Sequence, residues 1–445
     1  MASFHLVSLG CAKNLVDSEV MLGILQQNNW ELTEDPAEAD VLIINTCGFI
    51  QPAVEEAIEV ILEMGQYKKD DPAKYLVVTG CLVQRYLAEL SRDLQEVDLF
   101  VGTEGVAEIA SLLQKLFDGK QKEKAHCPDR FLMNASLPRT LSTPFFRSSV
   151  KITEGCNNRC TYCMIPSIRG DLRSREIADI ITELQLLEAS GVKEISLIAQ
   201  DLTAYGNDLD ATTNLIALLS NILKETSIPW LRLMYLYPSG VKDALFDLVQ
   251  SDPRILPYMD IPFQHVSDSI LKNMHRRYGY GDLCRFIDRI RDAVPDIALR
   301  TTMMVGFPGE TEDDIQELEG FLTDYRIDHV GVFSYTNEEG ALSEFFEEQC
   351  SEEIKKERMQ RILELQAGIS KEILQKYIGQ TVPVLVEGLS RETDLLLEGR
   401  TVYQAPDIDG CVYINDGIAN PGDIVQVRIT EAQIYDLVGG IVKQV

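Results

Sequence analysis

One strand-and-turn pattern repeats through the first third of the chain. The runs FHLVSLGC, VLIINTCGF and YLVVTGC are short, apolar and β-branched, and each ends in a small polar turn followed by helical periodicity. A fourth run, VDLFVG, comes next. Strands that alternate with helices at a spacing of about 35 residues form βαβ units, which build a parallel sheet. The pattern therefore predicts a parallel α/β domain over residues 1–120.

A cysteine lies at the strand end of each of the three repeated runs. Cys11, Cys47 and Cys81 are separated by 36 and 34 residues. In a parallel sheet the carboxyl ends of the strands share one edge, where ligands gather near the point at which the strand order reverses. The three thiols can therefore converge on one bound group. The alternative is that each cysteine is a small apolar residue packed at a strand end.

The rest of the chain divides into a linker and two further domains. Residues 121–145 lose periodicity and gather Lys, Pro and Ser, which is typical of a linker. Residues 146–375 contain six strand-like runs, mostly separated by helical patterns, and a long amphipathic helix, which predicts a partial (β/α)6 barrel. Residues 378–445 consist of short strands divided by Gly, Pro, Asn and Asp, which predicts a small antiparallel β-barrel.

The bulk composition limits the possible classes of function. At 445 residues the chain exceeds what one core supports, in agreement with several domains. It lacks an apolar run of about 18 to 20 residues and a secretory signal, so we expect a cytoplasmic protein without a membrane span. Ten cysteines in a reducing compartment favour metal or redox chemistry over disulfides.

The net charge of the chain indicates which kinds of partner it can bind. The chain has 41 Lys and Arg against 70 Asp and Glu, a formal net charge of -29. Such a surface opposes binding of free nucleic acid, whose affinity normally comes from neutralising phosphates. It favours a basic partner, although acidity can also serve solubility alone.

The stretch TEGCNNRCTYCMIP places Cys156, Cys160 and Cys163 within eight residues. A structural zinc site closes a tetrahedron with a fourth ligand, and no second Cys or His pair follows at a suitable spacing. Three thiolates instead suit a 4Fe-4S cluster whose fourth iron stays open for a cofactor or substrate. The motif therefore predicts a reactive iron–sulfur site.

This motif resembles that of the radical S-adenosylmethionine superfamily, with Tyr162 as the aromatic residue before the last cysteine. In that superfamily the open iron binds S-adenosylmethionine, which is cleaved to a radical. The whole chain resembles the methylthiotransferase branch. LGCAKN, NTCGF and TGCLVQR match its first cysteine set, so the resemblance implies a second, auxiliary 4Fe-4S cluster on Cys11, Cys47 and Cys81. It also implies a flavodoxin-like N-terminal domain and a C-terminal barrel of the TRAM type, which is OB-like.

Several strings are similar to the RimO type of this branch, which modifies an aspartate of the ribosomal protein uS12. They are SLGCAKNLVDSE, CMIPSIRGDLRSR and QAPDIDGCVYI. The resemblance implies an enzyme that places a methylthio group on the aspartate β-carbon, with S-adenosylmethionine as both methyl donor and radical source. It also implies a low-potential electron donor, a sulfur donor and a substrate that is free or on an assembling ribosome.

Two alternatives remain open at this stage. The first is a methylthiotransferase for modified adenosine in transfer RNA, and the second is a non-catalytic two-cluster electron carrier. Residues 378–445 hold four Lys and Arg against ten Asp and Glu, whereas an RNA-binding barrel should be basic and carry interleaved aromatic residues. The barrel charge therefore favours the basic ribosomal protein.

Weaker candidates lie at the ends of the predicted barrel strands. Gln200, Asp201, Gln264 and Arg300 are expected near the barrel mouth as contacts of S-adenosylmethionine, and Arg300 could pair with its carboxylate. Ordinary hydrogen bonding at strand ends is the alternative for each. No catalytic residue is assigned beyond the clusters. Two further interpretations are that His265 is an interior histidine and that Arg169, Arg173 and Arg175 form surface ion pairs, with contact to the substrate carboxylate or backbone as the alternative for these arginines.

Overall fold

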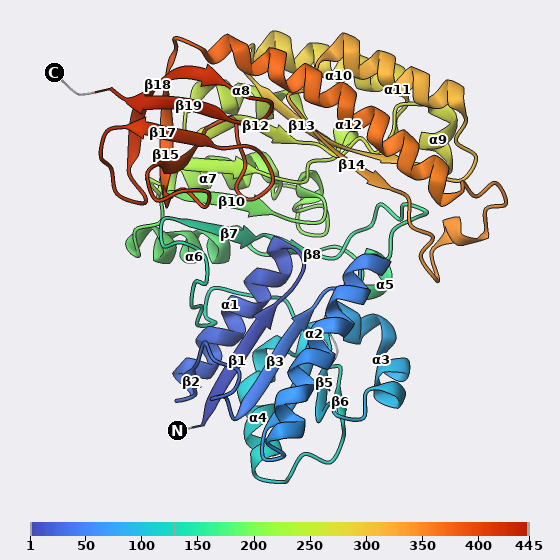
Figure 1. Cartoon of the computed structure of the whole chain (residues 1–445), viewed down its shortest axis with the longest axis vertical. Helices are drawn as coiled ribbons and strands as arrows, with labels where there is room; N and C mark the ends of the chain where they lie inside the picture. The colour runs from blue at the N-terminus through green and yellow to red at the C-terminus, as the bar shows by residue number, and fades with distance from the viewer. Residues whose placement is uncertain (1, 129, 443–445) are drawn as a thin grey trace.

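The computed structural model describes residues 2–128 and 130–442. Two lobes make up the molecule (Figure 1). The lower lobe is the N-terminal α/β domain, and the upper lobe contains the partial barrel with the C-terminal barrel beside it. The predicted α/β architecture is confirmed.

The N-terminal domain is a parallel sheet of six strands in the order β2-β1-β3-β4-β5-β6. Its central strand, β3, has the sequence VLIINT and is buried along its whole length, as expected of a strand covered by helices on both faces. The strands are β1 (Ser3–Ser8), β2 (Glu31–Leu32), β3 (Val41–Thr46), β4 (Tyr75–Gly80), β5 (Leu99–Val101) and β6 (Ala125–His126). The helices are α1 (Ala12–Gln27), α2 (Gln51–Asp70), α3 (Cys81–Asp93), η1 (Thr103–Glu108) and α4 (Ile109–Phe117).

The strand order positions the first cysteine set. It reverses between β1 and β3, which are neighbours in the sheet although β2 lies between them in sequence. This reversal is the place where open α/β sheets bind ligands. The sheet also extends further than the sequence pattern suggests, because β6 comes from the segment expected as a linker and pairs with β5.

The second domain is an open half-barrel of six parallel strands in the order β14-β13-β12-β11-β10-β7. All six predicted strand runs are present: β7 (Arg147–Lys151), β10 (Glu194–Ile198), β11 (Trp230–Leu233), β12 (Ile255–Asp260), β13 (Ala298–Val305) and β14 (His329–Ser334). The covering helices include α6 (Ile177–Ala189), α7 (Leu215–Glu225), α8 (Asp243–Ser251), α9 (Asp268–Asn273), α10 (Tyr280–Ala293), α11 (Glu312–Tyr325) and α12 (Glu352–Leu374). A short pair, β8 (Thr153–Glu154) and β9 (Arg173–Ser174), and the helix α5 (Ile165–Arg169) flank the loop that carries the second cysteine set.

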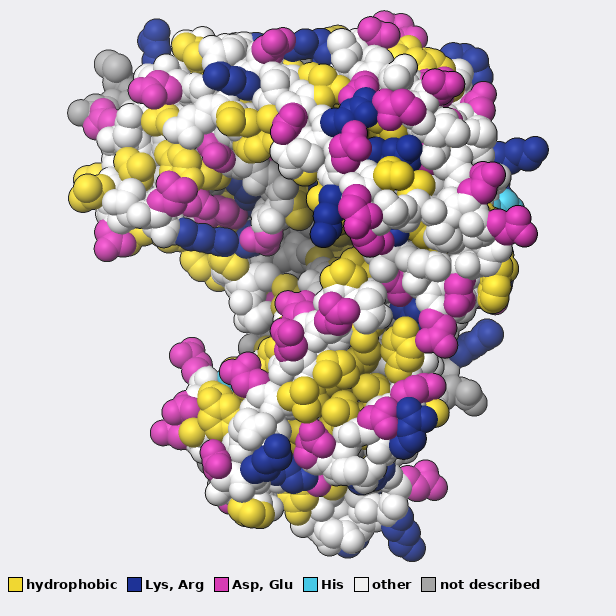
Figure 2. Space-filling model, turned by 45° about the vertical axis from the view of Figure 1, so that its right-hand side comes forward, with side chains coloured by type: hydrophobic (Ala, Val, Ile, Leu, Met, Phe, Trp, Pro, Cys, Tyr) yellow, Lys and Arg dark blue, Asp and Glu magenta, His cyan; other side chains and the backbone are white. Residues whose placement is uncertain are grey.

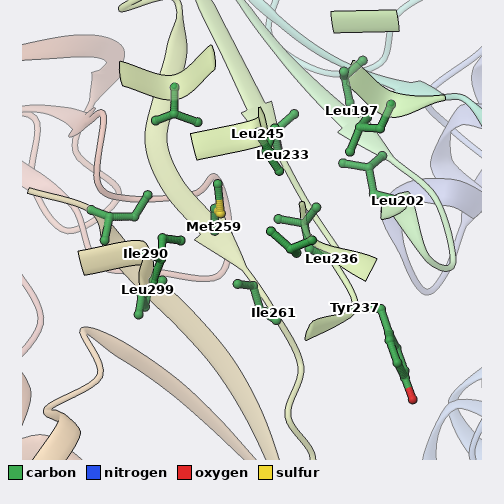
Figure 3. Packing of buried hydrophobic residues seen from close by; sticks show 14 of the residues in the cluster. Leu197, Leu202, Leu233, Leu236, Tyr237, Leu245, Met259, Ile261, Ile290 and Leu299 are labelled. Atoms are coloured by element: carbon green, nitrogen blue, oxygen red, sulfur yellow. The ribbon is translucent and has the colours of Figure 1, made fainter. Parts of the chain in front are cut away.

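The main core lies between this curved sheet and its helices. Leu197, Leu233, Met259 and Leu299 come from four neighbouring strands and point to the same side (Figure 3). Ile290 of α10 packs against them from the helix layer. This packing makes the half-barrel a rigid support for the loops at its strand ends.

The C-terminal domain is a closed five-stranded barrel with the order β15-β16-β17-β19-β18. Its strands are β15 (Thr381–Leu389), β16 (Leu397–Thr401), β17 (Val412–Asp416), β18 (Ile424–Ala432) and β19 (Leu437–Ile441). The expectation of a wholly antiparallel barrel is wrong in one detail, because β17 and β19 pair in parallel to close it. Lys443, one of the four basic residues counted in this domain, lies outside the described residues.

Buried charges attach the C-terminal barrel to the half-barrel. Glu194 of β10 accepts hydrogen bonds from Arg232 at 2.7 Å and from Arg400 of β16 at 2.6 Å. Burial alone would raise the pKa of Glu194, but the two guanidinium groups lower it to about 2. A buried carboxylate with two arginine partners stays ionised. The contact therefore fixes the position of the C-terminal barrel relative to the half-barrel.

The surface is hollowed between the two lobes. Figure 2 shows a notch between the C-terminal barrel and the N-terminal domain, with acidic side chains spread over both lobes. Among the described residues, no helix is both long and apolar enough to cross a bilayer.

Candidate functional site

The first cysteine set lies at the point where the strand order reverses. Cys11 follows β1 and directly precedes α1, Cys47 follows β3, and Cys81 is the first residue of α3. The loops that carry them are packed closely. A Cβ atom added at Gly10 would lie 2.7 Å from the Cβ of Cys47, and one added at Gly48 would lie 3.0 Å from the carbonyl carbon of Cys81. The convergence of these three strand ends is therefore present in the structure.

Asn14 holds two of these loops together. Its side-chain amide donates to the carbonyl oxygens of Leu9 at 2.8 Å and Asn45 at 3.3 Å, just ahead of Cys11 and Cys47. The amide of Asn45 donates back to the Asn14 carbonyl at 2.9 Å. Because both asparagines are buried, these bonds have no competition from water. They fix the relative position of the first two cysteines.

The second cysteine set occupies one loop between β8 and α5. The loop begins with Gly155, whose φ of 74° lies in the left-handed region, and a Cβ there would lie 2.2 Å from the Asp171 carbonyl oxygen. The backbone N–H of Cys156 donates to the Gly170 carbonyl at 3.1 Å. Gly170 also has a left-handed φ, of 75°, and its bond with Cys156 joins the start of the loop to the residue that follows α5. Only a residue without a side chain fits at position 155.

The pKa values of the thiols in the two cysteine sets shift in different directions. Burial raises the pKa of Cys47 and of Cys156 to about 11 and that of Cys163 to about 12. At Cys11 desolvation also acts upward, but the Lys13 ammonium and the backbone N–H of Asn14 outweigh it and lower the pKa. A thiol of raised pKa keeps its proton near neutral pH, so binding of a metal at Cys47, Cys156 or Cys163 would release a proton.

The donor set fits iron–sulfur clusters better than a single ion. Within residues 2–128 and 130–442, no three His, Cys, Asp or Glu side chains are arranged to hold one metal ion. A cluster makes a different demand, because each of its thiolates binds a separate iron atom. Three thiols on closely packed loops, with no fourth protein ligand beside them in sequence, match that demand at both sites.

A buried network of four charges connects the two cysteine sets. Asp17 of α1 accepts from Lys151 at 2.5 Å through one carboxylate oxygen and from Arg169 at 2.8 Å through the other. Glu154 of β8 accepts from Lys151 at 2.6 Å and lies 3.4 Å from Arg169. Burial alone would raise the pKa of Glu154, but the two cations lower it to about 2. The network joins α1, which follows Cys11, to both ends of the loop that carries the second set.

A second buried ion pair joins the same two domains. Arg85 of α3 bonds Glu338, which follows β14, at 2.9 Å, and the Arg85 guanidinium also donates to the Gly48 carbonyl at 3.0 Å. Glu338 in turn accepts from the backbone N–H of Gln51 at 2.8 Å. The residues that follow Cys47 are therefore held by the half-barrel as well as by their own domain.

Three of the four predicted cofactor contacts lie at strand ends on the side of the second cysteine loop, and the fourth, Arg300, is paired with other residues. Gln200 and Asp201 lie beside the second cysteine loop, where Gln200 donates to Glu154 at 3.0 Å and Asp201 accepts from Asn158 at 2.7 Å. Gln264 follows β12 with a left-handed φ of 72° and pairs through its backbone with β13.

Arg300 is engaged elsewhere, because Asp260 lies 3.0 Å and Asp409 of the C-terminal domain 3.4 Å from its guanidinium. The Arg300 guanidinium is therefore not free to bind a ligand in this structure.

His265 is fully buried, as expected of an interior histidine, with Glu310 at 3.4 Å.

The interpretation of three arginines as surface ion pairs is wrong. Arg169 and Arg175 are buried, and Arg173 is mostly shielded beside Glu104 of the N-terminal domain. The roles of Asn14 and Asp17 were also not predicted from the sequence. Their partners lie up to 155 residues away, so no local pattern marks them, although Asn14 is part of LGCAKN and Arg169 of CMIPSIRG.

Three known families match successive parts of the chain. Residues 3–102 match the uncharacterized protein family UPF0004, residues 150–322 the radical SAM superfamily, and residues 378–442 the TRAM domain. The three matches follow the three structural domains.

Curated relatives match the chain along almost its whole length. A protein of Desulfotalea psychrophila named ribosomal protein uS12 methylthiotransferase RimO is 60% identical over 99% of both chains. Proteins with the same name from Citrifermentans bemidjiense and Geobacter sulfurreducens are 46% and 45% identical, and each alignment covers 98% of both chains.

Solved structures resemble the fold at much lower identity. The radical S-adenosylmethionine methyltransferase TsrM of Kitasatospora setae has a TM-score of 0.56 at 15% identity, covering 74% of this chain and 72% of its own. The cobalamin-dependent radical enzyme OxsB has a TM-score of 0.54 at 13% identity, covering 81% of this chain and 56% of its own. These likenesses support the domain architecture.

Proposed function

Since this chain belongs to the RimO family of methylthiotransferases, we propose that it replaces a hydrogen on the β-carbon of an aspartate in ribosomal protein uS12 with a methylthio group. The observation that carries the proposal is the meeting of two three-cysteine sites at one domain interface. A reaction that removes hydrogen from an unactivated carbon and then adds sulfur needs two cofactors near one substrate.

The residues present fit the groups that this chemistry requires. When bound, a 4Fe-4S cluster on Cys156, Cys160 and Cys163 with S-adenosylmethionine would supply the radical, and an auxiliary cluster on the other three cysteines would supply the methylated sulfide. The polypeptide holds the two sites at a fixed separation through Asp17 and Arg169. Figure 2 shows a notch between the lobes, and we propose that a loop of the protein substrate enters there.

Gln200, Asp201 and Gln264 are the proposed contacts of S-adenosylmethionine. All three follow strands of the half-barrel at the end where the second cysteine loop lies. Arg300 would have to exchange Asp260 or Asp409 for the cofactor carboxylate, so it is the weakest member of this set. The spare carbonyl oxygen of Gln200 is buried without a hydrogen-bond donor, which suits it to accept from a ligand amino group.

The proposed partners follow from charge and chemistry. The net charge of -29 supports a basic protein substrate over a phosphate backbone. A low-potential electron donor and a sulfur donor are needed for repeated turnover. Because uS12 is made and assembled into ribosomes in the cytoplasm, we place the protein there, acting on free uS12 or on an assembling small subunit.

The test compares the native protein with two variants that each lose one site. Reduced, reconstituted protein is incubated with S-adenosylmethionine and purified uS12, and deoxyadenosine and the mass of uS12 are measured. We expect Cys160→Ala to form no deoxyadenosine. Cys47→Ala should still form it but should leave uS12 unmodified.

A deletion strain separates the two substrate classes. We expect uS12 from this strain to lack the methylthio group while methylthio-adenosine in its transfer RNA is unchanged. The opposite pattern, with modified uS12 and depleted methylthio-adenosine, would show that the substrate is transfer RNA and not uS12. If the native protein forms no deoxyadenosine at all, the proposal of a radical reaction is wrong.

A further inference from the structure

Arg169 contacts a cysteine of the other domain. It is the last residue of α5 and lies six residues after Cys163, yet its Nη2 is 3.3 Å from the sulfur of Cys81 and 3.4 Å from the Asn14 side chain. Only 4% of Arg169 is exposed. A residue of the radical domain thus reaches the first cysteine set.

The orientation of this guanidinium is fixed by its other partners. Nη1 donates to Asp17 at 2.8 Å and lies 3.4 Å from Glu154, so the planar group cannot turn without losing a buried carboxylate. Lys151 bonds the same two carboxylates at 2.5 and 2.6 Å. Two anions and two cations sum to zero, which makes their joint burial tolerable and keeps Arg169 in place.

Lys151 differs from Arg169 in one respect. Both cations bond Asp17 and Glu154 and both are buried, but only Arg169 also reaches a cysteine. The chain therefore contains its own matched control for the contact with sulfur.

From this geometry we infer that Arg169 is a positioning residue of the auxiliary site, donating a hydrogen bond across the domain interface to the Cys81 sulfur when that sulfur binds iron. The inference rests on the proposed function for the identity of the bound group. Hydrogen bonds to ligand sulfurs raise the reduction potential of a cluster and strengthen metal retention, because they stabilise negative charge on the sulfur. The auxiliary site is then complete only when the two domains are docked.

The experiment uses full-length protein in which Cys156, Cys160 and Cys163 are all changed to Ala, so that only the auxiliary site can load. Two charge-balanced double changes are compared in this background, Glu154→Gln with Arg169→Met and Glu154→Gln with Lys151→Met, so that Asp17 still anchors Arg169 in the second. Each leaves one buried anion and one buried cation, which protects folding equally. Iron retention against a chelator and the reduction potential of the bound cluster are measured.

We expect the Arg169→Met pair to retain iron about 10- to 100-fold less well than the Lys151→Met pair and to have a more negative potential. Equal retention and equal potential in the two would overturn the inference. If the background protein itself loads no iron, the cluster assignment in the proposed function fails instead, so the two failures are distinct.

Discussion

Cys156, Cys160 and Cys163 share one eight-residue stretch, whereas Cys11, Cys47 and Cys81 come from three strand ends spread over 71 positions. The first arrangement is held by its own backbone, through Gly155 and the bond from Cys156 to Gly170, and by bonds within the half-barrel such as the one from Thr161 to the Asn273 carbonyl. The second depends on the strand order, on the asparagine pair beneath it and on Arg85 and Arg169. A local site can be lost by one local change, while a dispersed site is also sensitive to how two domains dock.

The largest expected effect is on this docking. Asp17→Ala should lower the free energy of unfolding by about 3–5 kcal/mol, because it leaves two buried cations with one carboxylate. It should also reduce iron at the auxiliary site, since the guanidinium beside Cys81 loses its anchor. Denaturant unfolding and iron per chain would be measured.

Glu194→Ala is the control for that change. It also removes a buried carboxylate shared by two cations, but at the interface with the C-terminal barrel, away from both cysteine sets. We expect a similar loss of stability with iron content unchanged. If Glu194→Ala depletes auxiliary iron as strongly as Asp17→Ala, the docking interface has no special role in that site.

A smaller effect should follow from a change within the local loop. Gly155→Ala introduces a Cβ that meets the Asp171 carbonyl oxygen at 2.2 Å on a backbone with left-handed φ. We expect a loss of about 2–3 kcal/mol and selective loss of iron from the radical site, because overpacking displaces the loop. Iron analysis in proteins that lack one cysteine set or the other would detect the selectivity, and equal loss from both would contradict it.

The contrast between local and dispersed sites explains which features could be predicted from the sequence. The cysteine loop, the six barrel strands and the three repeated strand ends have local signatures in spacing and periodicity, and all were predicted. Arg169 was misjudged because a charged side chain carries no local sign of burial when its partners are Asp17 and Cys81, 152 and 88 positions away. The parallel closure of the C-terminal barrel by β17 and β19 was also missed, since short strands indicate their number but not their pairing.

Asn14 allows a comparison of the same residue type at the two sites. Asn14→Ala should lower stability by about 1–3 kcal/mol, because the Leu9 and Asn45 carbonyls lose a buried donor. Asn157 makes one bond in the radical loop, accepting from the backbone N–H of Leu172 at 3.1 Å, and is exposed. We expect Asn157→Ala to cost less than Asn14→Ala in thermal unfolding and to leave auxiliary iron intact; a reversed order would place the stronger constraint on the local loop.

The smallest effect concerns a contact between the domains next to Cys11. The Lys13 ammonium lies 3.5 Å from the ring centroid of Tyr235, which follows β11 of the half-barrel. Cation–π contacts of partly exposed groups are worth about 0.5–1 kcal/mol, so Lys13→Met and Tyr235→Leu should each destabilise the protein modestly. The informative quantity is their coupling in a double-mutant cycle, because it isolates the contact from the other losses at each position.

Tyr235→Phe, which keeps the ring and loses only the hydroxyl, is the matched control for this cycle and should retain the coupling with Lys13. We expect a coupling of about 0.5–1 kcal/mol for the Leu variant, measured by denaturant unfolding. Additive effects would mean that Lys13 contributes nothing to docking. The dispersed site would then be attached to the half-barrel by its buried ion pairs alone, with the cation beside Cys11 acting only on the pKa of that thiol.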